Sequence, residues 1–301
     1  MKKSIILSTL LGMLIVGTVH AQSGGDGYVS RSLQVLLAAR TIDSNIRIET
    51  FVDGKEYAFW GNYAEQALPR ATQNVFMRSV FRLELSSQTH SIGSTPNQMT
   101  LVCYASEDGE KHQIEQYTVI EGNQSGITID VKKLENRLKA GNREIFFSQA
   151  SELRKYGGLA GMMRQISRFY EFSLPTQENL QGDETVPAWK LTGTLRNIHR
   201  KELLTRFGGL DSKGHYPKDF PSDVELWIGR HNDFPYKVRY LRRISEKSEQ
   251  KELLFQEAFY KVTLNGTPFP LSDARFAPLK FPASIFSIQD YTDSFIKELG
   301  L

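Results

Sequence analysis

Residues 223–244, DVELWIGRHNDFPYKVRYLRRI, decide the fold. In the first half of this stretch every second residue is apolar, namely Val224, Leu226 and Ile228. After a polar break at 230–233 the same two-residue alternation returns in Tyr236, Val238 and Tyr240. A period of two predicts an antiparallel hairpin with one buried face and one wetter face. Pro235 begins the second strand, where the missing ladder donor is tolerated.

The chain before the hairpin shows the same period in several further segments. Asp53 and Gly54 predict a tight turn between two strands. Leucines spaced three and four residues apart near the amino terminus instead predict a starting helix. We therefore expect a helix over 28–40, followed by strands over 45–52, 55–63, 81–85, 99–105 and 113–120.

The middle of the chain has a helical pattern. Asp130 can cap a helix over 131–139, and apolar residues recur every three or four positions over 151–170. Gly157, Gly158 and Gly161 each weaken the early half of the second helix by about 1 kcal/mol relative to alanine. They indicate either close packing or a break near Gly157 and Gly158.

The carboxy-terminal part returns to strands. We expect a polar loop over 177–183, a strand over 189–195, a short helix over 199–207, the hairpin, and a further strand over 253–264. An irregular stretch at 269–282 leads to a final helix capped by Asp290. Strands, then helices, then strands, without a strand–helix alternation or an internal repeat, predict an α+β fold on an antiparallel sheet.

The first residues have the features of a secretory signal peptide. Lys2 and Lys3 precede an apolar run over 5–19, and the small residue Ala21 precedes Gln22. A membrane anchor is the alternative, but the run has about 15 residues where a span needs about 20. We expect a signal peptide at 1–21 cleaved near Ala21, a flexible leader at 22–28, and one domain at 29–301 with a helical insertion at about 128–172. The protein would then be periplasmic.

Charge and cysteine content exclude several classes of partner. Loss of Lys2 and Lys3 takes Lys plus Arg from 37 to 35 against 34 acidic residues, so the mature chain is nearly neutral. No overall field then favours nucleic acid or an anionic membrane. Cys103 is the only cysteine, so no internal disulfide forms and no cysteine at the cleavage site can be acylated. We interpret Cys103 as a buried structural thiol, with a catalytic thiol as the alternative.

No local motif satisfies a catalytic template. The histidines are too scattered for the paired ligands of a zinc protease helix. The segment GNQSG at 122–126 lacks a serine at its third position, which a nucleophile elbow requires. A serine–histidine–aspartate site or a carboxylate pair assembled from distant residues stays open. We expect no enzyme activity, no cofactor and no metal, with an unrecognised secreted hydrolase as an alternative.

Two groups of side chains remain as candidate surfaces. Arg239, Arg242 and Arg243 form a basic cluster, which we assign to the solvated outer face of a strand, with an acidic partner as the alternative. Aromatic residues on the predicted strands and the methionines of the long helix either fill a core or line a cavity for a variable apolar ligand. The candidate cavity residues are Phe59, Phe81, Leu83, Met163, Trp189, Leu191, Leu226 and Ile228.

Four segments carry a resemblance to a known family: FWGNYAEQ at 59–66, VELWIGRHNDFPYKVRY at 224–240, LLFQEAFYKVTLNG at 253–266 and FSIQDYTDSFIKEL at 286–299. Together with the order of elements, they resemble the LolA-like superfamily of outer-membrane lipoprotein carriers, especially its long exported members. The resemblance implies a curved antiparallel sheet that forms an incomplete, half-open barrel, with helices packed against its concave face. In the carriers, the apolar space between sheet and helices takes acyl chains.

The resemblance to the lipoprotein carriers also implies a function. We expect a non-enzymatic exported protein that binds a lipid or an acylated protein and shields acyl chains between half-barrel and helices. Its other partners would be membrane proteins of the envelope, and the chain would be a monomer. The chain is longer than the short carriers and its helical insertion is large, which favours lipid binding over lipoprotein transfer itself. An envelope sensor or scaffold that binds a partner protein is the alternative from another class.

Overall fold

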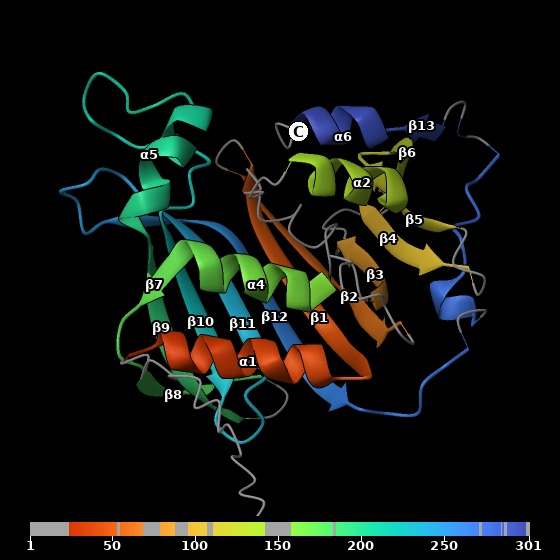
Figure 1. The fold of residues 1–301 in the computed structure, drawn as a ribbon, viewed down its shortest axis with the longest axis horizontal. Helices are drawn as coiled ribbons and strands as arrows, with labels where there is room; N and C mark the ends of the chain where they lie inside the picture. The colour runs from red at the N-terminus through yellow and green to blue at the C-terminus, as the bar shows by residue number, and fades with distance from the viewer. Residues whose placement is uncertain are drawn as a thin grey trace, which may run out of the picture.

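A single sheet organises the molecule. The computed structural model describes residues 24–52, 55–68, 79–87, 96–106, 111–141, 158–182, 185–270, 273–283, 285 and 288–298. Within these residues, thirteen strands form one sheet in the order β13-β6-β5-β4-β3-β2-β1-β12-β11-β10-β9-β7, with β8 also paired to β9. The path does not close on itself, so the α+β class with a curved, open sheet is confirmed (Figure 1).

The strands come from both halves of the chain. Neighbours pair antiparallel, except that β13 runs parallel to β6. The strands are β1 (Thr41–Val52), β2 (Lys55–Ala67), β3 (Ser79–Ser87), β4 (Gln98–Ala105), β5 (His112–Ile120), β6 (Asn123–Asp130), β7 (Tyr170–Phe172), β8 (Thr176–Leu180), β9 (Val186–Leu195), β10 (Asp223–Gly229), β11 (Pro235–Arg243), β12 (Lys251–Leu264) and β13 (Ile288–Asp290).

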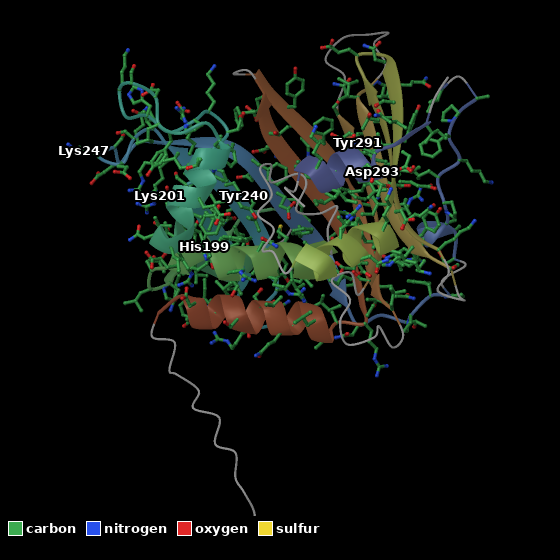
Figure 2. All side chains as sticks on the ribbon, turned by 45° about the horizontal axis from the view of Figure 1, so that its top comes forward. His199, Lys201, Tyr240, Lys247, Tyr291 and Asp293 are labelled. Atoms are coloured by element: carbon green, nitrogen blue, oxygen red, sulfur yellow. The ribbon has the colours of Figure 1, made fainter. Side chains whose placement is uncertain are left out.

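Two pairs of helices cover one face of the sheet. The described helices are α1 (Asp26–Ala38), α2 (Val131–Gly141), α4 (Gly158–Phe169), α5 (Asn197–Arg206) and α6 (Thr292–Glu298), with a 3₁₀ turn η1 (Ala274–Phe276). Helices α1 and α4 pack on one another across β9 to β1, whereas α2 and α6 pack together over β4 to β6 (Figure 1). In Figure 2, His199 and Lys201 of α5 therefore lie on the opposite side of the view from Tyr291 and Asp293 near α6.

Helix α4 packs on the sheet through a stripe at helical spacing. Its buried large residues recur every three or four positions, as expected for a helix with one apolar face, and are Leu159, Met162, Met163, Ile166 and Phe169. The predicted helix over 151–170 is confirmed from Gly158 onward, and residues 151–157 lie outside the described residues. The helix ends one residue early because Tyr170 begins the short strand β7, which sequence reasoning missed.

The carboxy-terminal segment covers part of the outer face. The side chain of Gln66 on β2 exchanges two hydrogen bonds with the backbone of Phe269, at 2.6 and 2.7 Å. Further along, the N–H of Leu279 donates to the carboxylate of Glu115 at 2.6 Å. Phe269 and Leu279 thus tie the carboxy-terminal segment to the outer faces of β2 and β5.

Most predicted elements are confirmed, and three assignments are corrected. The amino-terminal helix, the meander, the Asp130 cap, the hairpin and the final helix all form, and the Asp130 side chain accepts from the N–H of Lys133 at 3.0 Å. The polar loop at 177–183 is wrong over most of its length because β8 occupies 176–180. Strands β6 and β13 were also missed. Helix α1 begins at Asp26, so the flexible leader does not extend to residue 28.

The start of α1 is fixed to strands that come much later in the sequence. The Asp26 carboxylate accepts hydrogen bonds from the N–H of Phe172 at 3.0 Å and from Arg196 at 2.9 Å. Gly25 is packed so closely that a Cβ there would lie 2.3 Å from the carbonyl oxygen of Ser173. The predicted signal peptide at 1–21 lies outside the described residues. Among the described helices, none is long and apolar enough to cross a membrane.

The hairpin forms as predicted, with two corrections to its faces. Trp227 is on the outer face but is only 2% exposed, because Lys190, Lys237 and Arg239 lie over its ring at 4.9, 4.9 and 5.8 Å. Tyr236 does not continue the regular alternation of Val238 and Tyr240, although it packs against the core. The register passes from Trp227 opposite Lys237 to Ile228 opposite Pro235, so Tyr236 is the extra residue of a β-bulge.

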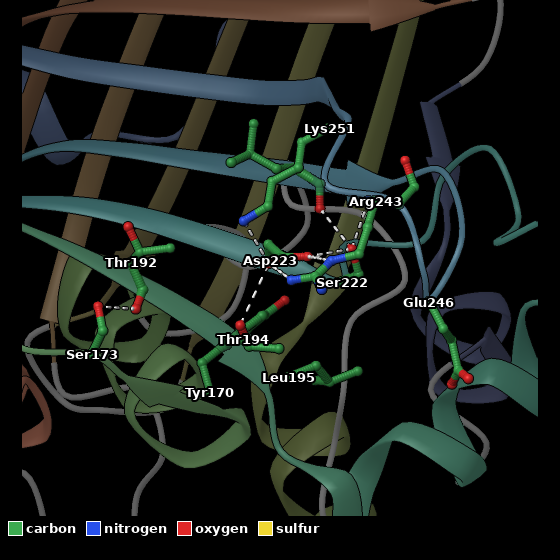
Figure 3. A network of polar contacts seen from close by, with 12 residues as sticks. Tyr170, Ser173, Thr192, Thr194, Leu195, Ser222, Asp223, Arg243, Glu246 and Lys251 are labelled. Atoms are coloured by element: carbon green, nitrogen blue, oxygen red, sulfur yellow. Dashed lines mark hydrogen bonds and ion pairs between the residues drawn. The ribbon is translucent and has the colours of Figure 1, made fainter.

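A buried ionic network joins the end of the hairpin to β12. Asp223 is 0% exposed, and its carboxylate contacts Arg243 at 2.7 Å and Lys251 at 2.8 Å, while Ser222 donates to it at 2.7 Å (Figure 3). Burial alone opposes ionisation, but these hydrogen bonds outweigh it and hold the pKa of Asp223 below its ordinary value. One carboxylate thereby holds β10, β11 and β12 in register.

We expect Asp223→Asn to destabilise the protein by about 3 kcal/mol, because it leaves two cations partly buried beside a neutral amide. Urea unfolding at pH 7 measures this loss. Glu252→Gln is the matched control, since Glu252 is half exposed and pairs with Arg242; we expect it to cost less than about 1 kcal/mol. Equal effects of the two substitutions would contradict the role of the buried network.

Candidate functional site

The candidate cavity residues share the inner face of the sheet. Register places Leu226 opposite Leu191 and Ile228 opposite Trp189, and Met163 faces the sheet from α4. Phe59 and Trp189 are half-buried and the others are buried, and all belong to one continuous apolar cluster. The prediction that these residues face inward is consistent with this register; whether they contact a ligand stays a prediction.

The candidate residues on the sheet fall into two groups, which lie on strands that are not neighbours. Phe59, Phe81 and Leu83 are on β2 and β3, whereas Trp189, Leu191, Leu226 and Ile228 are on β9 and β10. Strands β1, β12 and β11 lie between the groups. At about 4.8 Å per strand, β3 and β10 are separated by about 24 Å along the sheet. A ligand that touched both groups would have to be elongated.

The candidate set predicted from the sequence leaves out the residues that connect the two groups, although the alternation places Val238 and Tyr240 on the buried face of the hairpin. The connecting residues are the inward residues of the middle strands, and they comprise Ile46, Ile48, Tyr63, Val238, Tyr240, Phe255 and Phe259. The alternation that would have identified them is present in β1 and β12. What the sequence lacked was the strand order that places β12 between β1 and β11.

Two acidic side chains interrupt this apolar face. Glu257 on β12 is completely buried, and register places it between Ile48 of β1 and Val238 of β11. Glu65 on β2 is also buried and lies at the end of the face nearer β3. A carboxylate is costly to bury without compensating contacts. The hydrogen-bond partners of Glu65 therefore show which part of the structure this carboxylate stabilises.

Glu65 holds the amino-terminal end of α4. Its carboxylate accepts hydrogen bonds from the N–H of Leu159 at 3.2 Å and from the hydroxyls of Tyr63 at 2.5 Å and Ser79 at 2.6 Å. A negative charge at this end also complements the helix dipole. Gly158, with φ of +58°, permits the approach, since a Cβ there would lie 2.6 Å from Glu65 Oε1.

The other end of α4 is joined to the sheet. The N–H of Arg196 donates to the carbonyl of Phe169 at 2.8 Å, and the hydroxyl of Tyr170 donates to the carbonyl of Pro221 at 2.8 Å. Burial, aided by the charge of Asp223, raises the pKa of Tyr170, so this hydroxyl stays protonated. Helix α4 is thus a cover fixed at both ends by polar contacts and along its length by apolar ones.

The covering helices leave little free space beside Glu65. A cavity of about 40 Å³ lies between α1, α4 and the ends of β1 to β3, and its lining includes Leu36, Ile42, Glu65, Ala160 and Arg164. That volume holds only a few water molecules. An acyl chain does not fit into this cavity while α4 is in its present position.

Cys103 and His112 form a buried pair near the same end of the sheet. The sulfur lies 3.4 Å from His112 Nε2, and Cys103 is 0% exposed. Burial raises the pKa of the thiol, as do the nearby charges of Glu65 and Glu135. Burial, followed by the charge of Lys132, lowers the pKa of His112 to about 4. A neutral thiol is a weak nucleophile, so this pair fits the structural interpretation of Cys103 better than the catalytic one.

The remaining sequence candidates take no part in this face. Arg239, Arg242 and Arg243 contact Glu225, Glu252 and Asp223 at 3.4, 2.5 and 2.7 Å, so each has an acidic partner within the chain. Within the described residues, no group of three His, Cys, Asp or Glu side chains is placed to hold a metal ion.

Among the comparisons with known proteins, only the search of solved structures finds similar proteins. No family model matches the sequence, and no curated protein matches it. Among solved structures, a DUF1329 family protein from Desulfovibrio piger is similar over 84% of this chain and 95% of its own, with 11% identity and a TM-score of 0.34.

Two further solved structures are similar at lower scores. A putative outer membrane lipoprotein-sorting protein domain from Vibrio parahaemolyticus is covered over 93% of its length and 78% of this chain, with 7% identity and a TM-score of 0.28. A beta-barrel-like protein of domain of unknown function DUF1849 from Brucella abortus is covered over 99% of its length and 75% of this chain, with 7% identity and a TM-score of 0.22. All three scores are below 0.5, and none carries a functional argument.

We expect Glu65→Gln to loosen α4 and to destabilise the protein by about 1–2 kcal/mol, because the amide loses the charge that faces the helix amino terminus. Hydrogen exchange of the α4 amides should accelerate more than that of β10. Glu84→Gln on the neighbouring strand is the control, since Glu84 is exposed and pairs with Arg82. Unchanged exchange in α4 would contradict the capping role of Glu65.

The buried His112 ring predicts acid sensitivity. Its pKa falls from 6.5 in the unfolded chain to about 4 in the folded protein, so its contribution is fully present above pH 6.5 and is lost as the pH falls toward 4. The unfolding free energy should drop by on the order of 3 kcal/mol over this window. Urea unfolding at several pH values measures the drop. His112→Gln should flatten the profile, whereas His231→Gln, at an exposed position, should retain it.

Proposed function

We propose that this chain is an exported, non-enzymatic protein of the periplasm that binds a lipid or an acylated protein on the inner face of its sheet. The observation that carries the proposal is the largely apolar inner face, which extends across β3 to β9 with the buried carboxylates Glu65 and Glu257 within it and is covered by amphipathic helices. This face is long enough along the sheet for an elongated apolar ligand, as the separation of β3 and β10 indicates.

The energetic reason for such a protein is the cost of apolar chains in water. Shielding an acyl chain is worth about 0.8 kcal/mol per CH₂ group. A ligand with a dozen such groups therefore gains enough to replace the contacts of a covering helix whose apolar stripe has five large side chains. The acyl chain of the ligand would take the place of the apolar stripe of α4. The inner face of the sheet would therefore be covered in both the free and the bound protein.

Helix α4 is the part of the cover that we expect to move. It carries Met162 and Met163, and methionine adapts to partners of different shape. To move, α4 would have to break the hydrogen bond at its amino-terminal end, which Glu65 accepts from the N–H of Leu159. The 40 Å³ cavity beside this end marks where a chain would begin to enter as the helix lifts.

The test uses residues 22–301 purified from the producing cells. Native mass spectrometry with lipid extraction should reveal a co-purified lipid, or the delipidated protein should take up a fluorescent fatty acid. A protein that is purified without lipid and takes up no fatty acid would contradict the proposal. A stable protein partner without lipid would support a sensor or scaffold instead, and hydrolysis of ester, peptide or glycoside substrates would support an enzyme.

A pair of substitutions at Leu226 tests the inner face directly. Leu226 is fully buried at the centre of β10, so Leu226→Asp places an unpaired charge among apolar side chains and should prevent folding or abolish uptake. Leu226→Met keeps the volume and should cost less than about 1.5 kcal/mol and retain uptake. Circular dichroism and the fatty-acid assay measure both; a folded, fully competent Leu226→Asp protein would mean that the wrong face was assigned.

A further inference from the structure

Strand β12 continues past the start of its neighbour β11. The pairing of β11 with β12 ends at Lys237 opposite Ala258, whereas the pairing of β1 with β12 continues to Ile42 opposite Leu264. Between Asn45 opposite Tyr260 and Asp43 opposite Thr263, the register shifts at a bulge. Beyond Ala258, one side of β12 therefore faces a gap in the sheet instead of a paired strand.

The bulge is held in an unusual conformation. Lys261 has φ of +50°, in the left-handed region that costs a residue with a side chain about 1 kcal/mol or more. Bulges of this kind re-aim side chains and recur beside binding sites. The pairing of β12 with β1 on both sides of the bulge keeps Lys261 in this conformation and offsets its strain.

A pocket of about 290 Å³ lies at this point. Its lining includes Val186 at the start of β9, Tyr236 at the start of β11, and Tyr260, Lys261, Val262 and Thr263 of β12. The volume approaches the lower end of the range for small-molecule sites, which begins at about 300 Å³. Phe259 of the inner face also lines this pocket, so the pocket adjoins that face, although none of the eight candidate residues lines it.

One wall of the pocket is fixed before any ligand arrives. The ring of Tyr236 lies over Gly229, where a Cβ would come within 2.7 Å of the ring. The amide of Asn232 donates to the Tyr236 hydroxyl at 2.9 Å, while the amide oxygen of Asn232 accepts from the N–H of Phe234 at 3.1 Å. Because the Tyr236 oxygen accepts from Asn232, its own proton remains to be donated to another group.

The lining sets the chemistry of a ligand. Lys261 is its charged side chain, and the lining contains hydroxyls from Tyr236, Tyr260 and Thr263 but no Asp or Glu. Valines and tyrosine rings supply apolar surface beside these donors. We propose that this pocket binds a compact organic acid, with its carboxylate at Lys261 and its apolar body against the tyrosines and valines. This site goes beyond the proposed lipid binding and does not depend on it.

The test compares three probes on residues 22–301: benzoate, its neutral counterpart benzamide, and inorganic phosphate. Isothermal titration should show benzoate binding at least tenfold more tightly than either of the others, because only benzoate combines the charge with an apolar body. In proton–nitrogen correlation spectra, the backbone amides of 260–263 should shift with benzoate. Equal binding of benzoate and benzamide, tighter binding of phosphate, or shifts confined to another region would each overturn the proposal.

Variants assign the contacts. Lys261→Asn removes the charge while placing a residue that tolerates the left-handed conformation, and it should weaken benzoate at least tenfold without changing benzamide. Tyr236→Phe removes the donor and should weaken benzoate severalfold. Lys213→Gln, an exposed lysine after α5, is the matched control and should bind like the parent. Retained benzoate affinity in Lys261→Asn would overturn the assignment of Lys261.

Discussion

The pairing of β1 with β12 is the interaction on which the rest of the structure depends. Ile46 lies opposite Phe259, 213 positions further along the chain. Without this ladder, the amino-terminal meander and the carboxy-terminal strands would be two small sheets, each with its own apolar face and an exposed edge. With it, they share one inner face, and α4 reaches from the Glu65 contact on β2 to the β7 edge. Pairings this distant in sequence are slow to form, so we regard them as the late step of folding.

Much of the fold was predictable because alternation was strong where one face is buried. The hairpin, β1, β3 and β12 all have that pattern. Strand β8 escaped prediction because its residues TQENL are nearly all exposed, so no buried face imposes a period. Strand β6 escaped because its polar start resembles a loop. The burial of Trp227 escaped for another reason: the stems of neighbouring lysine and arginine side chains cover it.

The candidate site was predictable only in part. Alternation identified which side chains point inward, as Leu226 and Leu191 illustrate. It could not tell that β3 and β10 are five strands apart in the sheet, because strand order is a property of long-range pairing. Nor could it find the contact of Glu65 with Leu159, which joins residues 94 positions apart. The bulges at Tyr236 and Lys261 likewise appear only in the pairing register and have no local sequence signal.

The anchoring of α1 has a consequence for how the protein is made. Asp26 forms hydrogen bonds with Phe172 and Arg196, and α1 packs on α4. Helix α1 therefore cannot form these contacts until the chain has been synthesised past residue 196. Helix α1 is thus early in the sequence but among the last elements to find its partners, and its leucines stay exposed until strands β7 and β9 are in place.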